Sequence, residues 1–241
     1  MPRRLPLSLA FTIPKVEGQR NEDSYRTSSR GVYALSDGAS ISFDSALWAQ
    51  ILVRRFARDP TFTPTPTWVM AAIAEFSRQH DRDNLPWMKQ ASFDRGTFAS
   101  LLGVQVIDQG RSVQVLAIGD SLAVLGDGDR IIATFPYSTP SEFEQSPQLL
   151  CTNPAENSFL YEKNYRYELT KSWTFDGLGQ PTLLCMTDAL GHWLLSRSDE
   201  GQSPIAMLRS ITSLKSFKQF VQTERASSRM KCDDTTPIVF P

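Results

Sequence analysis

The stretch that decides the fold is Gly31–Ser40, which reads GVYALSDGAS. Its apolar run is typical of a short buried strand, and the strand leads directly into Asp37 and Gly38. An acidic residue at the end of a buried strand is costly unless a cation or hydrogen-bond donors meet it. Glycine allows a close backbone approach, so its carbonyl oxygen can serve as a ligand. An isolated Asp-Gly pair is usually a tight turn. The rest of the chain therefore has to decide whether Asp37 and Gly38 form such a turn or a cation-binding position.

The same arrangement recurs along the chain. Acidic residues stand at or near the ends of predicted strands at four further sites, namely Glu22-Asp23, Asp120, Asp188 and Asp233. Carboxylates that meet at one rim of a sheet stack repel one another, and burial raises their pKa values unless cations neutralise them. Mg²⁺ and Mn²⁺ prefer oxygen ligands, and two such ions about 3.5–4 Å apart can bind a phosphate and activate a water. The sequence therefore predicts a pocket for hard divalent cations.

Strand and helix patterns alternate over most of the chain. Helices are predicted at 42–58, at 67–83 with Thr67 as the cap, at 203–211 and at 213–226. Strands are predicted at 7–13, 31–36, 96–107, 113–118, 122–125, 131–135, 181–186 and 238–240. We expect the strands between 96 and 135 to form an antiparallel meander, with Gly126–Asp129 as a hairpin turn. Two successive helices after strands indicate a helical layer on a sheet.

Length and composition favour one globular domain that covers residues 1–241. Of the 241 residues 41% are hydrophobic and 21% are charged, and no break in composition marks a domain boundary. The segment 136–181 contains four prolines before residue 155 and scattered aromatic residues with weak periodicity. Such a long connection is usually functional or mobile, so we interpret it as a flap-like segment that selects the substrate.

Charge and hydropathy exclude several classes of function. The net charge is −1 and the pI is about 6.2, which argues against a nucleic-acid partner or an anionic membrane surface. No stretch approaches the ~20 apolar residues of a membrane span, and the first residues lack a signal-peptide pattern. The three cysteines form no Cys-x-x-Cys motif, and we expect Cys185 and His192 to be packing residues. A cytoplasmic protein is the expectation.

Six short motifs occur in the order found in a known enzyme family. They span residues 21–236 and read NED (21–23), ALSDG (34–38), GTFA (96–99), IGDS (118–121), MTDAL (186–190) and DDTT (233–236). In this order the chain resembles the metal-dependent type 2C serine/threonine protein phosphatases, in a divergent bacterial branch. The resemblance implies an α+β fold, a four-layer α-β-β-α sandwich of two antiparallel sheets flanked by helix pairs.

The resemblance also implies a catalytic centre with two Mn²⁺ or Mg²⁺ ions. Asp37 would bridge both metals, while Asp188 and Asp233 would bind the first. The carbonyl of Gly38 and the side chain of Glu22 would complete the second site. A metal-activated water would then attack phosphorus in line, without a phosphoenzyme.

Two further acidic residues have implied roles. Asp23 would hold a water that coordinates a metal, and Asp120 matches the acidic residue that helps to form a third metal site in bacterial members.

The chain departs from the family at the phosphate-binding position. Family members have an arginine four residues before the glutamate, whereas this chain has Gly18 there. Arg20 is the nearest candidate for a replacement, and a surface role is the competing interpretation. The glycine-rich stretch after Asp37-Gly38 is replaced by Ala39–Ser42, so the histidine that some members use as a general acid is absent.

Two functions remain open at this point. The first is a metal-dependent phosphatase that acts on phosphoserine or phosphothreonine in a phosphorylated protein, in signalling opposite a cognate kinase. The second is a catalytically weak or inactive relative that binds phosphorylated partners or regulates a kinase. The retained carboxylates favour the first, and the missing arginine and glycines keep the second open.

Overall fold

A computed structural model of the chain describes residues 8–28, 30–162 and 165–240, and its strands form two five-stranded antiparallel sheets. The β11 sheet has the order β1 (Leu9–Ala10), β12 (Pro237–Phe240), β11 (Pro181–Met186), β7 (Leu122–Asp127) and β8 (Arg130–Phe135). The β5 sheet has the order β10 (Thr170–Thr174), β6 (Ser112–Ile118), β5 (Leu101–Ile107), β3 (Val32–Ser36) and β2 (Ser24–Thr27). A short pair, β4 (Phe98–Ala99) with β9 (Leu150–Cys151), stands apart from both sheets.

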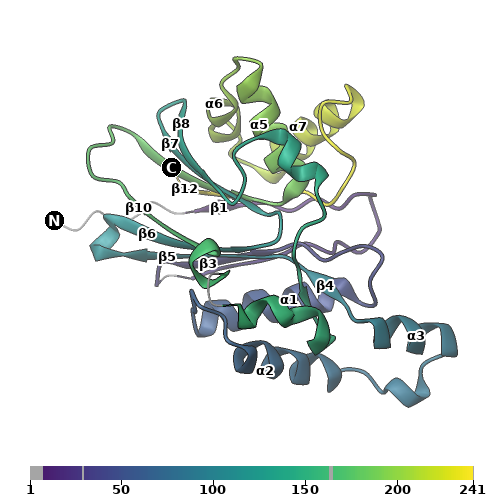
Figure 1. Cartoon of the computed structure of the whole chain (residues 1–241). Coiled ribbons are helices and arrows are strands. Elements are labelled where there is room, and N and C mark those ends of the chain that lie inside the picture. The colour runs from purple at the N-terminus through teal and green to yellow at the C-terminus, as the bar shows by residue number, and fades with distance from the viewer. Residues whose placement is uncertain (1–7, 29, 163–164, 241) are drawn as a thin grey trace.

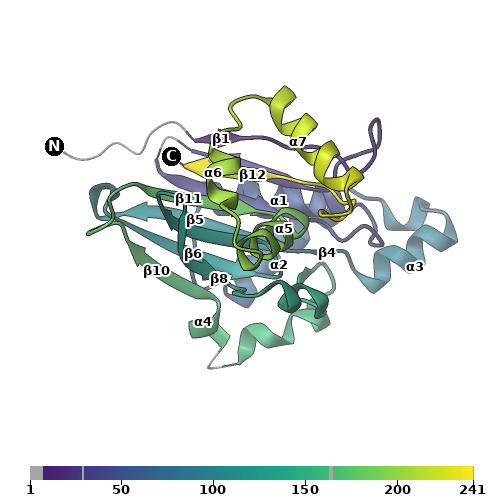
Figure 2. The same cartoon turned by 90° about the horizontal axis from the view of Figure 1, so that it is seen from above.

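Helices cover the outer faces of the two sheets (Figure 1). The β5 sheet carries α1 (Ser45–Arg58) and α2 (Pro66–Ser77), and the β11 sheet carries α5 (Asp188–Asp199), α6 (Pro204–Arg209) and α7 (Leu214–Ala226). Viewed from above, α5, α6 and α7 lie over the strands of the β11 sheet (Figure 2). The predicted α+β sandwich is confirmed, with three helices instead of a pair on one face.

Three apolar layers hold the sandwich together. One lies between the sheets and includes Leu35 and Ile238, and the other two lie between each sheet and its helices, around Trp48 and Trp193. All four of these side chains are fully buried. The alternation of apolar residues along β3 explains this arrangement, because successive side chains of a strand point to opposite faces. Leu35 therefore faces the other sheet, and Ala34 faces the helices.

The predicted single meander over 96–135 is wrong. β5 and β6 pair in the β5 sheet, whereas β7 and β8 pair in the β11 sheet. The chain crosses between the sheets at residues 119–121, where Gly119 has a φ of +98°. In the sequence, a short turn between two strands looks the same whether the second strand pairs with the first or, as β7 does after β6, joins the other sheet. The hairpin turn at Gly126–Asp129 is confirmed, since it joins β7 to β8.

Several predicted element boundaries also need correction. α2 begins at Pro66 with Thr65 as its cap, because the Thr65 hydroxyl accepts a hydrogen bond from Trp68 N; Thr67 is not the cap. α2 ends at Ser77, and the chain then forms a 3₁₀ turn, η1 (Arg82–Asn84), and α3 (Trp87–Arg95). α3 has no buried residue, so its sequence carries no apolar stripe to indicate a helix.

The predicted strand over 96–107 is interrupted at Ser100, between β4 and β5. The predicted strand at 7–13 shrinks to β1 within the described residues, with Ile13 forming an isolated bridge to Thr235. Position 7 lies outside the described residues. The helices predicted at 203–211 and 213–226 are confirmed as α6 and α7 within two residues at each end.

Residues 136–181 contain short elements of their own. They form the 3₁₀ helices η3 (Pro140–Glu144) and η4 (Pro154–Tyr161), the strands β9 and β10, and the one-turn helix α4 (Tyr165–Glu168). β10 extends the β5 sheet by pairing with β6. A further 3₁₀ turn, η2 (Asp108–Gly110), joins β5 to β6. No helix in the described part of the chain is long and apolar enough to cross a membrane.

Candidate active site

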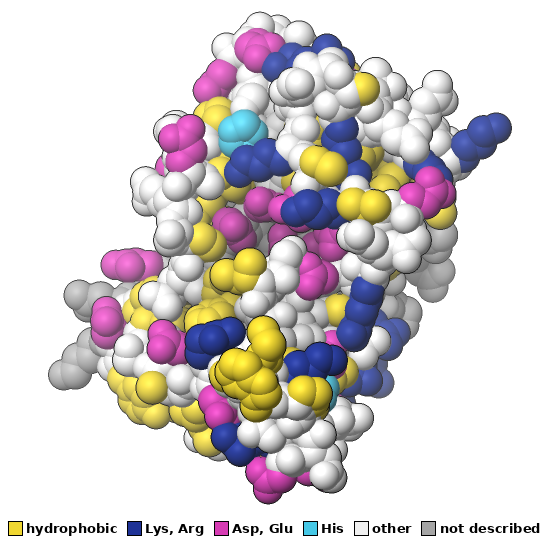
Figure 3. All heavy atoms as spheres, turned by 90° about the vertical axis from the view of Figure 1, so that its right-hand side faces the viewer, with side chains coloured by type: hydrophobic (Ala, Val, Ile, Leu, Met, Phe, Trp, Pro, Cys, Tyr) yellow, Lys and Arg dark blue, Asp and Glu magenta, His cyan; other side chains and the backbone are white. Residues whose placement is uncertain are grey.

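Four of the predicted acidic residues line one pocket at the rim where the two sheets meet. The pocket has a volume of about 230 Å³, and its walls are formed by Asp37, Gly38, Ala39, Ser40, Asp120, Pro147, Leu149, Asp188 and Asp233. We call it the acid pocket. Figure 3 shows acidic side chains gathered in a hollow at the end of the molecule where α3 lies, with lysine and arginine side chains around it. The structure thus brings together residues that are almost 200 positions apart.

Asp37 directly follows β3, lines this pocket and is held there through its backbone. Asp37 N donates to Ser100 Oγ at 2.9 Å, and Ser100 N donates to Asp37 O at 2.8 Å. The hydroxyl of Ser36 donates to the carbonyl of Ser100 at 2.5 Å. Ser100 can make these contacts because the strand is interrupted at this residue. Sequence reasoning assigned it to a regular strand and missed it.

Gly38 is required by close packing. A Cβ atom at this position would lie 2.7 Å from the carbonyl oxygen of Ser45, which is closer than real Cβ contacts. The backbone of Gly38 forms an isolated bridge with Ala99, and Ala39 N donates to Phe98 O. The Asp-Gly pair is therefore held between the start of α1 and β4, and it does not form a free surface turn.

Asp120 reaches the pocket from the crossover between the sheets. The next residue, Ser121, is buried, and its hydroxyl shares a hydrogen bond of 2.8 Å with Ser100 Oγ. Ser100 thus connects the backbone of Asp37 with the crossover that carries Asp120.

Asp188 and Asp233 come from the β11 sheet. Asp188 stands in the first turn of α5, directly after β11, and its Oδ1 accepts from Ala189 N. Asp233 lies in the loop before β12, and its Oδ1 lies 3.5 Å from Lys15 Nζ. An acidic residue in the first turn also interacts favourably with the helix dipole.

Glu22 and Asp23 are not among the residues that line the acid pocket. Glu22 Oε1 accepts a hydrogen bond from Ser45 Oγ at 2.5 Å. Asp23 is buried, and its Oδ2 accepts from Thr236 Oγ1 at 2.7 Å and from Thr187 Oγ1 at 3.1 Å. Asp23 Oδ1 is buried without a hydrogen-bond partner among the described residues.

Asp234 is a structural anchor that sequence reasoning did not assign. Its two carboxylate oxygens accept from Lys15 N and from Glu22 N, each at 2.5 Å. These contacts fix both ends of the 15–22 loop to the segment that carries Asp233. The motif DDTT contained Asp234, but a sequence cannot show which of two adjacent carboxylates faces the backbone.

The side chain of Arg20 pairs with Asp44. Its Nη1 lies 2.6 Å from Asp44 Oδ1, its side chain is 64% exposed, and it is not among the lining residues. Asp44 also lies 3.3 Å from His80 Nε2. Gly18, which occupies the position of the family arginine, has a φ of +83°, a conformation that disfavours other residues.

Burial and mutual repulsion raise the pKa values of the pocket carboxylates. Burial, followed by the charge of Asp188, raises the pKa of Asp120 to about 7. Burial raises the pKa of Asp37 well above its usual value, and the charges of Asp23 and Asp188 raise it further. Burial also raises the pKa values of Asp23 and Asp188. A cluster of carboxylates with this property favours any cation that enters it.

The donor chemistry of the site suits a hard divalent cation. Carboxylate and backbone carbonyl oxygens are the ligands such ions prefer, and the unpartnered Asp23 Oδ1 leaves a buried acceptor free. Within the described residues, however, no three His, Cys, Asp or Glu side chains form a group that could hold a metal ion as they stand. The acid pocket therefore has the composition of a metal site, although its side chains would have to move for three of them to hold one ion.

His192, which lies on α5, is a packed histidine, as predicted. Its ring makes an edge-on contact with Phe143 at 5.9 Å between ring centroids, and burial lowers the pKa of the imidazole. Cys185 is buried in the layer between the sheets, also as predicted.

Comparison with solved structures identifies the fold. The Mycobacterium tuberculosis serine/threonine phosphatase PstP/Ppp is 16% identical, with a TM-score of 0.61 and 97% of each chain covered. Stp1 from Staphylococcus aureus, also a serine/threonine phosphatase, is 14% identical, with a TM-score of 0.60 over 97% of this chain and 93% of that one. The catalytic domain of PstP in complex with two manganese ions is 16% identical, with a TM-score of 0.56 over 97% and 96% of the chains.

No family model matches this chain, and no curated protein matches its sequence. The likeness to these bacterial serine/threonine phosphatases therefore rests on structure. It covers nearly the whole chain, and it confirms the fold that the motif order implied.

Proposed function

We propose that this chain is a metal-dependent phosphatase that hydrolyses phosphoserine and phosphothreonine in proteins. The observation that carries the proposal is the acid pocket, in which Asp37, Asp120, Asp188 and Asp233 meet from both sheets. The fold shared with bacterial serine/threonine phosphatases supports the same reaction class. The manganese complex of PstP supports Mn²⁺ as the cation to test first.

In this proposal two Mn²⁺ or Mg²⁺ ions would supply positive charge for the phosphate and activate a water for attack on phosphorus. Asp37 would bridge them, Asp188 and Asp233 would hold one, and Glu22 with the Gly38 carbonyl would hold the other. Asp23, fixed by two threonine hydroxyls, would accept a hydrogen bond from a bound water. Asp120 would contribute to a third, looser cation site.

We also propose that residues 1–241 act as one phosphatase-like domain with residues 136–181 as its flap. Pro147 and Leu149 support this role, because both belong to that segment and line the acid pocket. An apolar wall beside a charged pocket excludes water from a bound phosphate and strengthens its electrostatic contacts.

The test is hydrolysis of p-nitrophenyl phosphate and of a phosphothreonine peptide with and without Mn²⁺. We expect metal-dependent turnover that Asp37→Asn and Asp188→Asn reduce by at least about a thousandfold. Asp129→Asn is the matched control, because Asp129 is an exposed aspartate of the β7–β8 turn. A protein that binds Mn²⁺ and the phosphopeptide without releasing phosphate would instead be the non-catalytic regulator.

A further inference from the structure

A cationic side chain at the mouth of the acid pocket would add to the attraction that bound cations exert on a phosphate. A phosphate monoester carries up to two negative charges, and the carboxylates of the pocket repel it. The candidates for this role are Arg20, Lys231 and Lys15. Arg20 is paired with Asp44 outside the pocket.

The backbone of Lys15 is held on both sides. Its amide donates to Asp234 Oδ1 at 2.5 Å, and its carbonyl accepts from Arg225 Nη1 at 3.3 Å and from the Cys232 thiol at 3.7 Å. Arg225 also donates to the carbonyl of Asp233. One arginine of α7 therefore ties Lys15 to the loop that carries Asp233.

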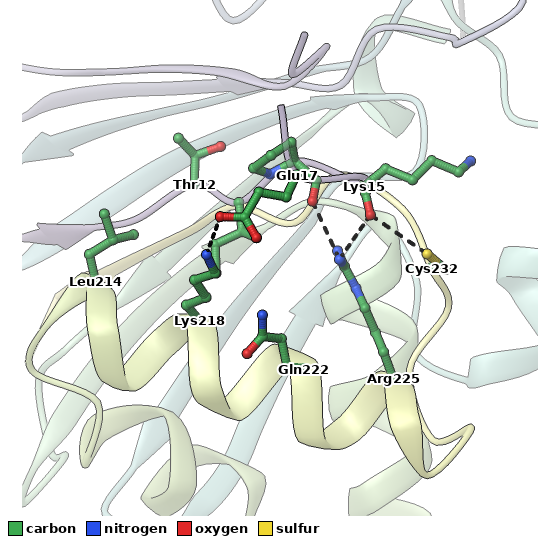
Figure 4. A pocket seen from close by; sticks show the side chains of 10 residues that line it. Thr12, Lys15, Glu17, Leu214, Lys218, Gln222, Arg225 and Cys232 are labelled. Atoms are coloured by element: carbon green, nitrogen blue, oxygen red, sulfur yellow. Dashed lines mark hydrogen bonds and ion pairs between the residues drawn. The ribbon is translucent and has the colours of Figure 1, made fainter. Parts of the chain in front are cut away.

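The side chain of Lys15 contacts one wall residue of the acid pocket, Asp233, although Lys15 itself lines the neighbouring groove and not the pocket. Figure 4 shows the groove between α7 and the 12–17 loop, with a volume of about 460 Å³, and the Lys15 ammonium extends away from it. On that other side, Lys15 Nζ lies 3.5 Å from Asp233 Oδ1. The side chain is 44% exposed, and an ammonium has three donors, so it can bind a further anion.

We propose that Lys15 binds the phosphoryl oxygens of the substrate at the mouth of the acid pocket. This inference rests on the proposed function and names the cationic residue of its site. In the absence of a bound cation the ammonium pairs with Asp233. Once a cation takes up the charge of Asp233, the ammonium is free to contact a phosphate, and the anchored backbone keeps it at the rim.

Lys231 is the main competitor. Its positive charge lowers the pKa values of Asp120 and Asp188, so it lies near the same acids. Its side chain is exposed, however, and its ammonium makes no ion pair or hydrogen bond with the described residues. What distinguishes Lys15 is its ion pair, which places its ammonium 3.5 Å from Asp233 Oδ1 at the edge of the acid pocket.

The first experiment is calorimetric titration of inorganic phosphate into the Mn²⁺-loaded protein. We expect Lys15→Gln to weaken phosphate binding about tenfold or more, and Lys15→Arg to stay within about threefold of wild type. Lys218→Gln is the matched control, because the Lys218 side chain is 43% exposed and is also ion-paired, with Glu17. It should bind phosphate as wild type does.

Separate measurements exclude a merely structural role for Lys15. Lys15→Gln should bind Mn²⁺ at least as tightly as wild type, because it removes a positive charge next to Asp233. With p-nitrophenyl phosphate, the KM and the inhibition constant of phosphate should rise together while kcat changes less. If Lys15→Gln does not fold, Mn²⁺ with phosphate should still protect Lys15 of the wild-type protein from acetylation and leave Lys218 unprotected.

Several outcomes would overturn the inference. These are phosphate binding by Lys15→Gln within twofold of wild type, a loss confined to Lys231→Gln, a parallel loss of Mn²⁺ binding, or a wild-type protein that binds no phosphate. Phosphate binding that depends on Lys15 without any hydrolysis would uphold this inference and refute the proposed function.

Discussion

Ser100 lies at the break between β4 and β5 and connects the backbone of Asp37 with Ser121, the neighbour of Asp120. Its hydroxyl accepts from Asp37 N and shares a hydrogen bond with the hydroxyl of Ser121, next to Asp120. The side chain of Ser100 is fully buried, so its hydroxyl has no water to replace these partners. The spacing of the acids in the pocket therefore depends on an uncharged residue.

Replacing this hydroxyl tests that dependence. We expect Ser100→Ala to lower the free energy of unfolding by about 1–3 kcal/mol, since the buried amide of Asp37 loses its acceptor. Ser172→Ala is the control, because Ser172 is exposed on the edge strand β10, and it should change stability by less than about 0.5 kcal/mol. Urea denaturation of the metal-free protein gives both values. Equal stability of the two variants would contradict the role of Ser100.

Gly38 gives a second test at the same scale. A methyl group at this position would overlap the backbone of Ser45, so Gly38→Ala should cost about 1–3 kcal/mol and weaken Mn²⁺ binding. Gly179→Ala is the control, because a Cβ there meets only Asp127 Oδ1 at an ordinary 3.7 Å. Thermal unfolding and Mn²⁺ titration of both variants check the prediction, which fails if Gly38→Ala behaves like Gly179→Ala.

For single residues, the sequence predicts the charged members of the candidate site better than the neutral ones. Asp37 and Asp188 could be predicted because each follows an apolar strand. A carboxylate in that position is costly to bury unless a cation or hydrogen-bond donors meet it. Thr187 and Thr236 could not be predicted as site residues, because a β-branched threonine is common in and near strands for its shape alone. Their hydrogen bonds to Asp23 depend on the pairing of β11 with β12, which is a property of the tertiary structure.

Among the elements, α5 and α7 are joined by a buried polar contact. Trp193 Nε1 of α5 donates to Glu224 Oε2 of α7 at 2.8 Å, and Arg229 donates to both oxygens of Glu224. Glu224 is only 5% exposed, and the hydrogen bond from Arg229 lowers the pKa of its carboxyl. This contact fixes the position of α7, from which Arg225 reaches the loop of Asp233.

Removing the carboxylate should loosen this pair of helices. We expect Glu224→Ala to cost about 2–4 kcal/mol, because the indole N–H of Trp193 and the guanidinium of Arg229 lose their partner. Glu200→Ala is the control, since Glu200 is half exposed and pairs with Arg197 at the end of α5. Near-ultraviolet circular dichroism, to which Trp193 contributes together with the other four tryptophans, follows the loss of tertiary structure during chemical denaturation. A cost below that of the control would refute the contact.

The elements that were mispredicted share one cause. The formation of α3 depends on where that segment packs, and so does the separation of the β5–β6 pair from the β7–β8 pair. Local apolar periodicity does not contain that information. α7 and β11 were predicted well because their sequence patterns are unambiguous. A long amphipathic helix buries its apolar stripe on a sheet, and an uninterrupted apolar strand is buried on both faces.

For the whole molecule, the pocket carboxylates make stability depend on pH and on cations. The pKa of Asp120 rises from 3.8 in a free aspartate to about 7, so the folded protein binds more protons than the unfolded chain between these values. The stability of the metal-free protein therefore falls as pH rises from about 4 to 7. Asp37, Asp23 and Asp188 act in the same direction, because their pKa values are also raised.

Calorimetry with EDTA and with Mn²⁺ measures this dependence. We expect the metal-free protein to have a Tm lower by about 5 °C at pH 8 than at pH 5.5, and Mn²⁺ to remove most of the difference. Asp120→Asn should flatten the metal-free curve. A metal-free Tm that rises between pH 5.5 and pH 8 would contradict the electrostatic account.

The crossing of the chain at residues 119–121 has a mechanical consequence. Asp37 directly follows a strand of the β5 sheet, Asp188 and Asp233 lie next to strands of the β11 sheet, and Asp120 lies on the segment that joins the two sheets. A slight slide of one sheet along the other would change the spacing of Asp37 from Asp188 and from Asp233 together, and would leave the spacing between Asp188 and Asp233 and the contacts inside each sheet as they are. A partner that binds the outer helices could thereby change the affinity of the acid pocket for a cation without touching the pocket.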